Sequence, residues 1–242
     1  MRYGIFSDVH SNLEALDAVI AAYKKESIDQ YLCVGDVVGY GADPRECIDK
    51  VKAIALFTVA GNHDWAATGL FPAEYFNQAA SEAIAWTKRN LNTQCWGFLE
   101  SLQVIFKNRD LTLVHGTLHE PEDFHYMTDT LAARHSFGLM EGNICFVGHS
   151  HMPGVFIRDL SGRISYKEKQ SLMVEKGNLY IVNVGSVGQP RDLNPDAAYC
   201  VYDTEENNIE IKRVKYDTGS ARKKIIDAGL PGFLGDRLLS GR

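Results

Sequence analysis

The chain has 242 residues, of which 45% are hydrophobic, 10% aromatic and 23% charged. These values are ordinary for a globular protein and exclude collagen-like, mucin-like and broadly disordered chains. There are 31 Asp and Glu residues against 25 Lys and Arg, so the formal net charge is −6. This charge argues against general nucleic-acid binding, which needs a basic face, but it leaves a single nucleotide or phosphate possible as a substrate.

Cysteine use and hydropathy bear on the cellular compartment. The five cysteines are scattered and contain no C-x-x-C pair, so neither a zinc ribbon nor a disulfide framework is expected. The segment Met1-Arg2-Tyr3-Gly4 has no signal-peptide pattern. No apolar run approaches the ~20 residues that span a bilayer. We therefore expect a cytoplasmic protein without a membrane partner.

The first sixty residues alternate between predicted strands and helices. Apolar runs predict strands at residues 2–6, 31–34 and 54–60. One helix is expected from Ser11, which would form a capping box with Glu14. Another is expected to begin at Asp43-Pro44, with Asp43 as the cap and Pro44 in the first helical position. This β-α-β-α-β order implies parallel strands with right-handed crossovers.

The rest of the chain is predicted to be first helical and then rich in strands. Helices are expected at about 77–102 and 129–141, and the tail at 219–242 should form short helices broken near 229–231. Strands are expected at residues 104–107, 111–115, 144–147, 154–158, 164–168, 179–182, 198–202 and 209–214. Two sheets that pack face to face and carry outer helices would accommodate this many strands, so we expect residues 1–242 to form a single domain.

Five of the predicted strands end in side chains that can bind a metal. These are Asp8 and His10, Asp36, Asn62 and His63, His115, and His149 and His151. Ligands of open α/β sheets bind outside the carboxyl ends of the strands, so these groups should converge on one site. In extended backbone, the i, i+2 spacing within the first and last pairs would point both side chains to the same side. Glycines flank four of the groups, at Gly35, Gly61, Gly116 and Gly148, where the backbone must turn tightly or approach closely.

The donor types favour one kind of chemistry. Carboxylate, imidazole and amide ligands suit divalent Mn, Fe, Zn, Ni or Co. Two such ions ~3.5–4 Å apart can hold the attacking and leaving oxygens of a displacement at phosphorus. Asp36 is the natural candidate for a carboxylate that bridges them. The donor types therefore suit a site for divalent metal ions.

The order of the motifs carries a family resemblance. They are D-x-H at 8–10, G-D at 35–36, G-N-H-D at 61–64, a lone histidine at 115 and G-H-x-H at 148–151. In this order they resemble the calcineurin-like metallophosphoesterase superfamily. The segment N-V-G-S at 183–186, followed by Q-P-R at 189–191, is similar to the N-P-G-S…P-R segment of the small bacterial and archaeal phosphodiesterase branch, with Val184 in place of the proline.

The resemblance implies an α/β fold, a four-layer α/β/β/α sandwich of two mixed β-sheets flanked by helices. It also implies two metal positions, one held by Asp8, His10, Asp36 and His151 and the other by Asp36, Asn62, His115 and His149. The catalytic group would be Asn62, His63 and Asp64: His63 would protonate or stabilise the leaving oxygen, and Asp64 would orient its imidazole. The nucleophile would be a metal-bridging hydroxide, and the substrates would be small phosphodiesters or nucleotides.

Three other functions remain as alternatives. A nucleoside polyphosphate hydrolase would share the mechanism. A protein phosphatase is disfavoured, because its G-D-x-V-x-R-G and R-G-N-H-E motifs carry phosphate-binding arginines that this chain lacks. A retromer-subunit-like interaction scaffold is disfavoured, because such a protein would have lost ligands that this chain retains, above all His63.

Substrate contacts are harder to predict than metal ligands. Arg191 is the candidate cationic contact for a phosphate, although it could equally lie in a surface turn. Tyr40 and His119 are further candidates. Aromatic side chains near the G-N-H-D motif could stack on a nucleobase or could simply pack as core or lid; they are Trp65, Phe71, Tyr75 and Phe76.

Overall fold

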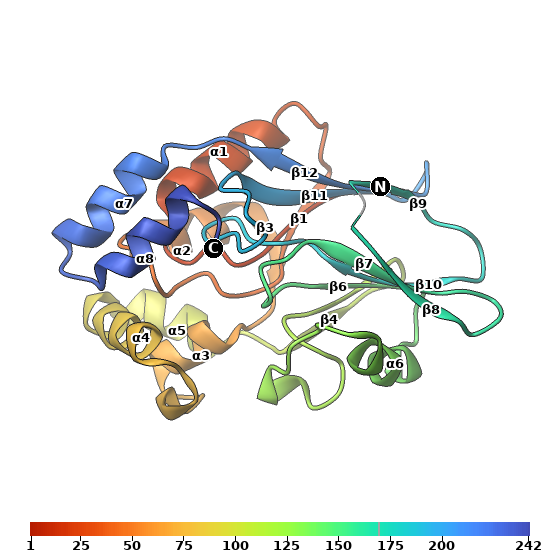
Figure 1. The fold of residues 1–242 in the computed structure, drawn as a ribbon, viewed down its shortest axis with the longest axis horizontal. Helices are drawn as coiled ribbons and strands as arrows, with labels where there is room; N and C mark the ends of the chain where they lie inside the picture. Colours follow the sequence, from red (N-terminus) through yellow and green to blue (C-terminus); the bar gives the residue numbers. More distant parts are fainter. Residues whose placement is uncertain (169) are drawn as a thin grey trace.

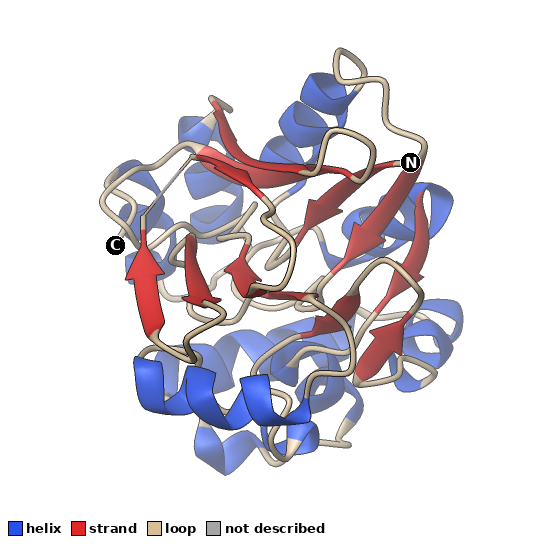
Figure 2. Cartoon of the chain, turned by 90° about the vertical axis from the view of Figure 1, so that its right-hand side faces the viewer, coloured by secondary structure: helices blue, strands red, loops and turns tan. Residues whose placement is uncertain are grey.

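Two six-stranded sheets form the middle of the molecule and helices cover them on both sides (Figure 1). The computed structural model describes residues 1–168 and 170–242. Figure 2 shows the strands together in the middle of the molecule, with helices on either side of them. The predicted four-layer α/β/β/α arrangement is therefore confirmed.

The first sheet has the strand order β3-β2-β1-β11-β12-β9. Its strands are β1 (Arg2–Phe6), β2 (Gln30–Cys33), β3 (Ala55–Thr58), β9 (Ser171–Met173), β11 (Ala197–Asp203) and β12 (Asn208–Val214). The strands β1, β2 and β3 are parallel, as the β-α-β-α-β order predicts. The strand β1 pairs on its other side with β11, which runs antiparallel to it. The sheet is therefore mixed.

The second sheet has the order β4-β5-β6-β10-β7-β8. Its strands are β4 (Ile105–Lys107), β5 (Thr112–Val114), β6 (Ile144–Val147), β7 (Gly154–Arg158), β8 (Ile164–Lys167) and β10 (Leu179–Asn183). The strands β5, β6 and β10 are parallel, and the other pairs are antiparallel. The carboxyl ends of β5 and β6 therefore lie at the same edge of the sheet.

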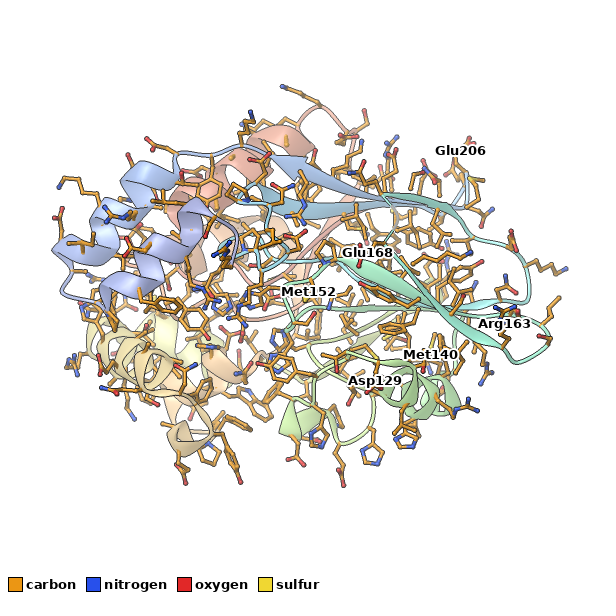
Figure 3. All side chains as sticks on the ribbon, in the orientation of Figure 1. Asp129, Met140, Met152, Arg163, Glu168 and Glu206 are labelled. Atoms are coloured by element: carbon orange, nitrogen blue, oxygen red, sulfur yellow. The ribbon has the colours of Figure 1, made fainter. Side chains whose placement is uncertain are left out.

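The helices fall into an outer layer on each sheet and a group at one end. The α-helices are α1 (Leu13–Tyr23), α2 (Pro44–Ile54), α3 (Asn62–Thr68), α4 (Gln78–Asn90), α5 (Thr93–Glu100), α6 (Thr130–Leu139), α7 (Thr218–Asp227) and α8 (Gly232–Asp236). The helices α1, α2 and α5 pack on the outer face of the first sheet, and α6, flanked by Asp129 and Met140, packs on the second (Figure 3). Short 3₁₀ turns are η1 (Ala73–Tyr75), η2 (Pro121–Asp123) and η3 (Arg237–Leu239).

The main core lies between the sheets and follows from the alternation of side chains along each strand. In β1, Ile5 faces the second sheet and packs in one cluster with Leu113 and Phe146, all fully buried. The next residue, Phe6, faces the opposite way and packs against α1 and α2. The strand β1 therefore packs against the second sheet on one face and against helices on the other.

One predicted helix cap is wrong, and the position of the other is confirmed. The helix α1 is capped by Asn12, whose side chain accepts from the backbone N–H of Ala15, and not by Ser11. Asp43 is the N-cap residue of α2 and Pro44 takes the first helical position, as predicted, but the Asp43 side chain makes no capping hydrogen bond. Both predicted capping carboxylates instead pair with Lys224 of α7, at 2.7 Å for Glu14 and 2.8 Å for Asp43. Lys224 lies far from both acids in the sequence, so local sequence patterns cannot predict these ion pairs.

Several element boundaries also differ from the prediction. The residues 54–60 are not one strand, because Ile54 ends α2 and the strand β3 covers only Ala55–Thr58. The region 77–102 holds two helices, with Asn92 capping the second. The helix α3 and the strand β9 were not predicted. No helix among residues 1–168 and 170–242 is long and apolar enough to cross a membrane.

The hydroxyl group of Tyr23 attaches the end of α1 to the strands β1 and β11 of the first sheet, and this attachment can be tested. The hydroxyl is fully buried and lies 2.9 Å from the carbonyl oxygen of Ile5 and 3.1 Å from that of Cys200. Tyr23→Phe leaves these carbonyls without this donor and should lower the free energy of unfolding by about 1–2 kcal/mol in urea denaturation. Tyr75→Phe, at a ring that is 75% exposed, is the control and should change it by less than about 0.5 kcal/mol. Equal effects would contradict the proposed attachment.

Candidate metal centre

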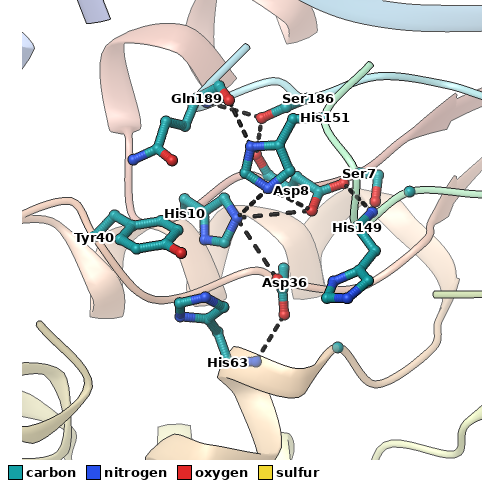
Figure 4. A network of polar contacts seen from close by, with 12 residues as sticks. Ser7, Asp8, His10, Asp36, Tyr40, His63, His149, His151, Ser186 and Gln189 are labelled. Carbon is teal, nitrogen blue, oxygen red and sulfur yellow. Dashed lines mark hydrogen bonds and ion pairs between the residues drawn. The ribbon is translucent and has the colours of Figure 1, made fainter. Parts of the chain in front are cut away.

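Loops from both sheets bring the predicted ligand residues together (Figure 4). Asp8 and His10 follow β1, Asp36 follows β2, His115 follows β5, and His149 and His151 follow β6. Asn62 and His63 begin α3, just after β3. All of these side chains are buried, with exposed fractions of 8% or less. The expected convergence at the carboxyl ends of the strands is therefore confirmed.

The backbone reason given for this convergence is wrong in one respect. Asp8, His10, Asp36, His149 and His151 do not lie in extended backbone, because their φ angles are between 49° and 65°. This left-handed region is unfavourable for non-glycine residues and persists only where surrounding contacts enforce it. Tight turns, not strand alternation, thus direct the side chains of each i, i+2 pair.

Close approach of the backbones explains two of the flanking glycines. A Cβ atom on Gly61 would clash with the Asp36 carboxylate, and a Cβ on Gly148 would clash with the side chains of Ser7 and Asp8. Hydrogen-bonded loops hold this arrangement, since the N–H of Asp8 donates to the carbonyl of Gly35. The loops after β2 and β3, and the loops after β1 and β6, can therefore approach this closely only where a side chain is missing.

Three imidazoles are oriented by backbone carbonyl groups. The Nδ1 atoms of His10, His115 and His151 lie 3.0, 2.7 and 2.5 Å from the carbonyl oxygens of Val38, Val34 and Gln189. A carbonyl can only accept, so each Nδ1 carries a proton and donates it. In the neutral imidazole the Nε2 atom then has a free lone pair, which is the arrangement found in metal-ligating histidines.

Two of these lone pairs face each other. The Nε2 atoms of His10 and His151 are 3.0 Å apart. With both Nδ1 protons used by carbonyls, neutral rings have no hydrogen to place between the two nitrogens. Their contact therefore requires a positive charge, either an added proton or a metal ion. No other observation at the site points as directly to a cation.

The two carboxylates have matching environments. One oxygen of each accepts a backbone hydrogen bond: Asp8 Oδ2 from His149 N at 3.1 Å, and Asp36 Oδ1 from His63 N at 2.9 Å. The other oxygens lie among imidazole nitrogens, with Asp8 Oδ1 3.1 Å from His151 Nε2 and Asp36 Oδ2 3.3 Å from His115 Nε2. Each carboxylate is thus fixed by one oxygen and presents the other to the centre.

Several polar atoms that face the centre have no hydrogen-bond partner within the described part of the chain. They are Asp8 Oδ1, Asp36 Oδ2, Asn62 Oδ1 and His115 Nε2. Buried polar atoms are rarely left unpaired, because each costs the desolvation of the group. Two carboxylate oxygens, an amide oxygen and an imidazole nitrogen are all ligands for divalent metals. The residues therefore fit a metal, and groups around Asp8 and around Asp36 each have the required proximity.

Burial and mutual contact shift the pKa values of these groups in opposite directions. Burial opposes the charged form of His115, but the neighbouring Asp36 and Asp8 carboxylates prevail and raise its pKa to about 9. Burial, together with nearby cationic groups, lowers the pKa of His149 to about 3 and that of His151 to about 4. Although burial also opposes ionisation of Asp36, the His115 and His63 imidazoles hold the pKa of Asp36 well below its ordinary value. Two carboxylates thus remain charged beside mostly neutral rings.

The imidazole of His63 lies over the centre without a hydrogen bond to Asp64. Its ring packs between Tyr40 and Phe76, with centroids 4.4 and 4.8 Å away, and burial lowers its pKa well below the usual value. The Asp64 carboxylate instead accepts from the backbone N–H groups of Val37, Val38 and Gly61, at 2.9 to 3.1 Å. Asp64 therefore acts on the position of His63 through the backbone of α3 and not by contact with the ring.

A cavity of about 660 Å³ opens over the centre. Arg191 and Tyr40, both predicted substrate contacts, line it together with predicted aromatic residues: Trp65, Phe71, Tyr75 and Phe76. The Arg191 guanidinium lies over the ring of Tyr40 at 5.7 Å and donates to its hydroxyl at 3.3 Å. His119 is not among the residues that line this cavity; it is half exposed and lies beside Glu120.

Sequence reasoning missed other residues of the site. Tyr126 stacks on His149 with ring centroids 3.8 Å apart, and Phe124 packs against Trp65. Ser186 donates to the carbonyl of Asp8 at 2.9 Å, and Gln189 supplies the carbonyl that holds His151. The N-V-G-S segment could have indicated the role of Ser186, whereas no sequence pattern marked Tyr126.

Known proteins resemble this chain in sequence and in fold. Residues 1–207 match the calcineurin-like phosphoesterase superfamily domain. The chain is 38% identical to the uncharacterized protein MJ0912 of Methanocaldococcus jannaschii over 98% of this chain and 97% of that protein. It is 23% identical to the phosphodiesterase YfcE of Escherichia coli over 85% of this chain and 89% of that protein. A metallophosphoesterase from Sphaerobacter thermophilus has a crystal structure that superposes with a TM-score of 0.88, at 36% identity, over 100% of this chain and 99% of that chain.

Metal binding at this centre should stabilise the folded chain. A divalent ion such as Mn²⁺, at about 100 times its Kd, adds about 2.7 kcal/mol and should raise the Tm by roughly 5–10 °C in a thermal scan. Asp36→Asn should abolish most of this shift, because it removes the charge from one of the unpaired oxygens. Asp227→Asn, at an exposed ion pair with Lys223, should retain it. An unchanged shift in the Asp36 variant would refute the site.

The metal-free protein should be most stable near pH 6.5. His115 has a folded pKa of about 9, above the ordinary 6.5, so its stabilisation is full below pH 6.5 and is lost as the pH rises toward 9. His149 and His151 have folded pKa values of about 3 and 4, so stability also falls as the pH drops from 6.5 toward 4. Urea unfolding with a chelator present would show this, and His115→Gln should flatten the alkaline side. Stability that rises from pH 6.5 to 8.5 would be incompatible with these shifts.

Proposed function

Because the chain belongs to the calcineurin-like phosphoesterase superfamily and is a metal-dependent phosphoesterase, we propose that it hydrolyses small phosphodiesters or nucleotides at a centre with two divalent ions. The proposal of two ions rests on the position of Asp36. Its Oδ2 atom has no hydrogen-bond partner in the described chain and lies between the two groups of candidate ligands. Its Oδ2 lies 3.6 Å from His10 Nε2 and 3.3 Å from His115 Nε2. A carboxylate between two ligand groups is suited to bridging.

Each ion would have its own ligands besides Asp36. One would be held by Asp8, His10 and His151, whose donor atoms lie within 4.8 Å of one another. The other would be held by His115, His149 and Asn62, and the first two form a similar group with Asp36. The donor set accepts Mn, Fe, Zn, Ni or Co.

When bound, such ions activate water as a nucleophile and neutralise charge on the phosphoryl oxygens. The part of His63 in the reaction would be to donate a proton to the leaving oxygen, or to hydrogen-bond to it. Its ring is held in place by the packing of Tyr40 and Phe76 and by its own backbone N–H, which donates to Asp36. Asp64 would serve as a positioning residue, because it ties the loop after β2 to the start of α3.

Arg191 would bind a non-bridging phosphoryl oxygen of the substrate. Its Nη2 is held by Gln189 Oε1 at 2.8 Å and by the Tyr40 hydroxyl, while its buried Nε has no partner in the described chain. An unpaired guanidinium N–H at the edge of the cavity favours an anion bound there. The aromatic wall of the cavity, which includes Trp65 and Phe71, would contact the base or aryl group that the ester carries.

The limited size of the cavity supports small substrates over folded phosphoproteins. A volume of about 660 Å³ is in the range of small-molecule sites. We also propose that residues 1–242 act as one domain, because α7 and α8 pack against α4 and Tyr40 in one apolar cluster next to the site.

A substrate panel tests the proposed function. Purified protein would be incubated with each of several divalent metals and with bis-aryl phosphates, cyclic nucleotides, aryl monophosphates, dinucleoside polyphosphates and a phosphopeptide. We expect the highest kcat/KM for a diester or nucleotide. Preference for a dinucleoside polyphosphate would indicate a nucleoside polyphosphate hydrolase and not a phosphodiesterase. Preference for the phosphopeptide would indicate a protein phosphatase. No turnover of any substrate would contradict enzymatic function.

The role of His63 predicts a specific kinetic pattern. His63→Ala should lower kcat by about 10²–10⁴-fold, since this is the usual contribution of a positioned acid, and most strongly for esters with poor leaving groups. Metal content should not change. Gly39→Ala is the matched variant, because a Cβ at Gly39 would clash with His63 Nδ1, and it should show the same dependence on the leaving group. A loss that is uniform across leaving groups would argue against proton donation.

A further inference from the structure

A second group of metal-binding side chains lies outside the centre, on the loop between β5 and α6. It consists of His119, Glu120 and His125, whose donor atoms all lie within 4.8 Å of one another. We propose that these three residues, called here the loop triad, bind a further divalent ion of the zinc type, and that this ion fixes one wall of the cavity.

The distances within the loop triad fit a common metal. Glu120 Oε2 lies 3.3 Å from His119 Nδ1 and 3.5 Å from His125 Nε2. Tetrahedral zinc binds nitrogen and carboxylate oxygen at roughly 2.0–2.2 Å, which places neighbouring ligand atoms about 3.3–3.6 Å apart. One carboxylate oxygen between two imidazole nitrogens thus has the spacing of a His₂Glu zinc site, and water can complete the coordination at this exposed position.

The loop is held on both sides of the triad. Thr117 Oγ1 donates to the carbonyl of His119 at 2.8 Å, and the N–H of Leu118 donates to Ser136 of α6 at 3.2 Å. Phe124 is only 3% exposed and anchors the chain directly before His125. The three ligands therefore extend from a segment whose ends are fixed, so little ordering would be needed on metal binding.

The charge around the loop triad favours a cation. Asp123 Oδ2 lies 3.8 Å from His125 Nε2, and Glu122 lies on the same short turn. A further imidazole close to the triad is that of His135 on α6, whose ring centroid is 5.8 Å from that of His119. The Glu120 and Asp123 carboxylates thus both lie within 4 Å of imidazole nitrogens, and a divalent ion between such groups would offset the repulsion between the two acids.

The loop triad is connected to the cavity through its own chain. His125 is both a member of the triad and a lining residue of the cavity, and Phe124 and Tyr126 beside it also line the cavity. Tyr126 stacks on the ring of His149 at 3.8 Å between centroids. An ion in the triad would therefore restrain the segment that covers one side of the main centre, although it lies outside that centre.

Metal stoichiometry tests this inference independently of the proposed function. Chelator-treated protein would be dialysed to equilibrium against Zn²⁺, and bound zinc per chain would be measured by mass spectrometry. Wild type should bind one more ion per chain than the double variant His119→Ala/His125→Ala. The same difference of one should appear in an Asp36→Asn background, where the main centre is impaired. Equal zinc content in wild type and the double variant would overturn the inference.

Two controls keep the result interpretable. Glu122→Gln removes a charge from the same turn without touching the triad and should keep the full zinc content, whereas Glu120→Gln should lose one ion. Co²⁺ in place of Zn²⁺ gives a second readout: the difference in visible absorption between wild type and the double variant should have the intensity typical of four-coordinate cobalt. Loss of zinc in Glu122→Gln, or equal visible absorption of the cobalt-loaded wild type and double variant, would contradict the proposal. The contacts between Glu120 and the two imidazoles would then be ion pairs without a metal. Circular dichroism and the Tm without metal check that each variant is folded, which the exposure of these side chains leads us to expect.

Discussion

The burial of two carboxylates at one point, Asp8 and Asp36, is the constraint on which the rest of the structure depends. A buried charge is costly unless it is paired and hydrogen-bonded. Each carboxylate receives one backbone N–H bond and directs its second oxygen toward imidazole nitrogens. Those imidazoles are in turn fixed by carbonyl groups. The left-handed turns and the glycines next to them are the backbone solution that lets loops of two sheets reach a common centre.

The layers and the members of the centre could be predicted from the sequence because both depend on short-range patterns. Apolar runs gave the strands, and polar residues at their ends marked one edge of the sheets. The geometry of the turns could not be predicted in this way. Asp8 and His10 were expected in extended backbone but have φ near 50°, since hydrogen bonds from other loops enforce that conformation. Likewise, Asp43 pairs with Lys224 and not with its own helix, which depends on the packing of α7.

The cavity shows where local patterns reach their limit. Arg191, Tyr126 and Trp65 line the same space but come from three distant parts of the chain. Nothing in the sequence around Tyr126 distinguishes it from an ordinary loop tyrosine, and its contact with His149 arises only when the loop after β5 folds over the end of β6. The candidate metal ligands thus follow from strand ends, whereas the wall of the cavity is formed by loops, whose paths follow from tertiary packing.

The position of β1 has a consequence for how the chain is made. This first strand lies inside the first sheet, between β2 and β11, and Arg2 is paired with Asp203. During synthesis β2 is available almost at once, but β11 leaves the ribosome only after most of the chain has been translated. One edge of β1 therefore stays open for that whole period, and open strand edges are templates for aggregation. His10 and His151 are likewise 141 positions apart, so the pair of imidazoles at the centre can form only when synthesis is well advanced.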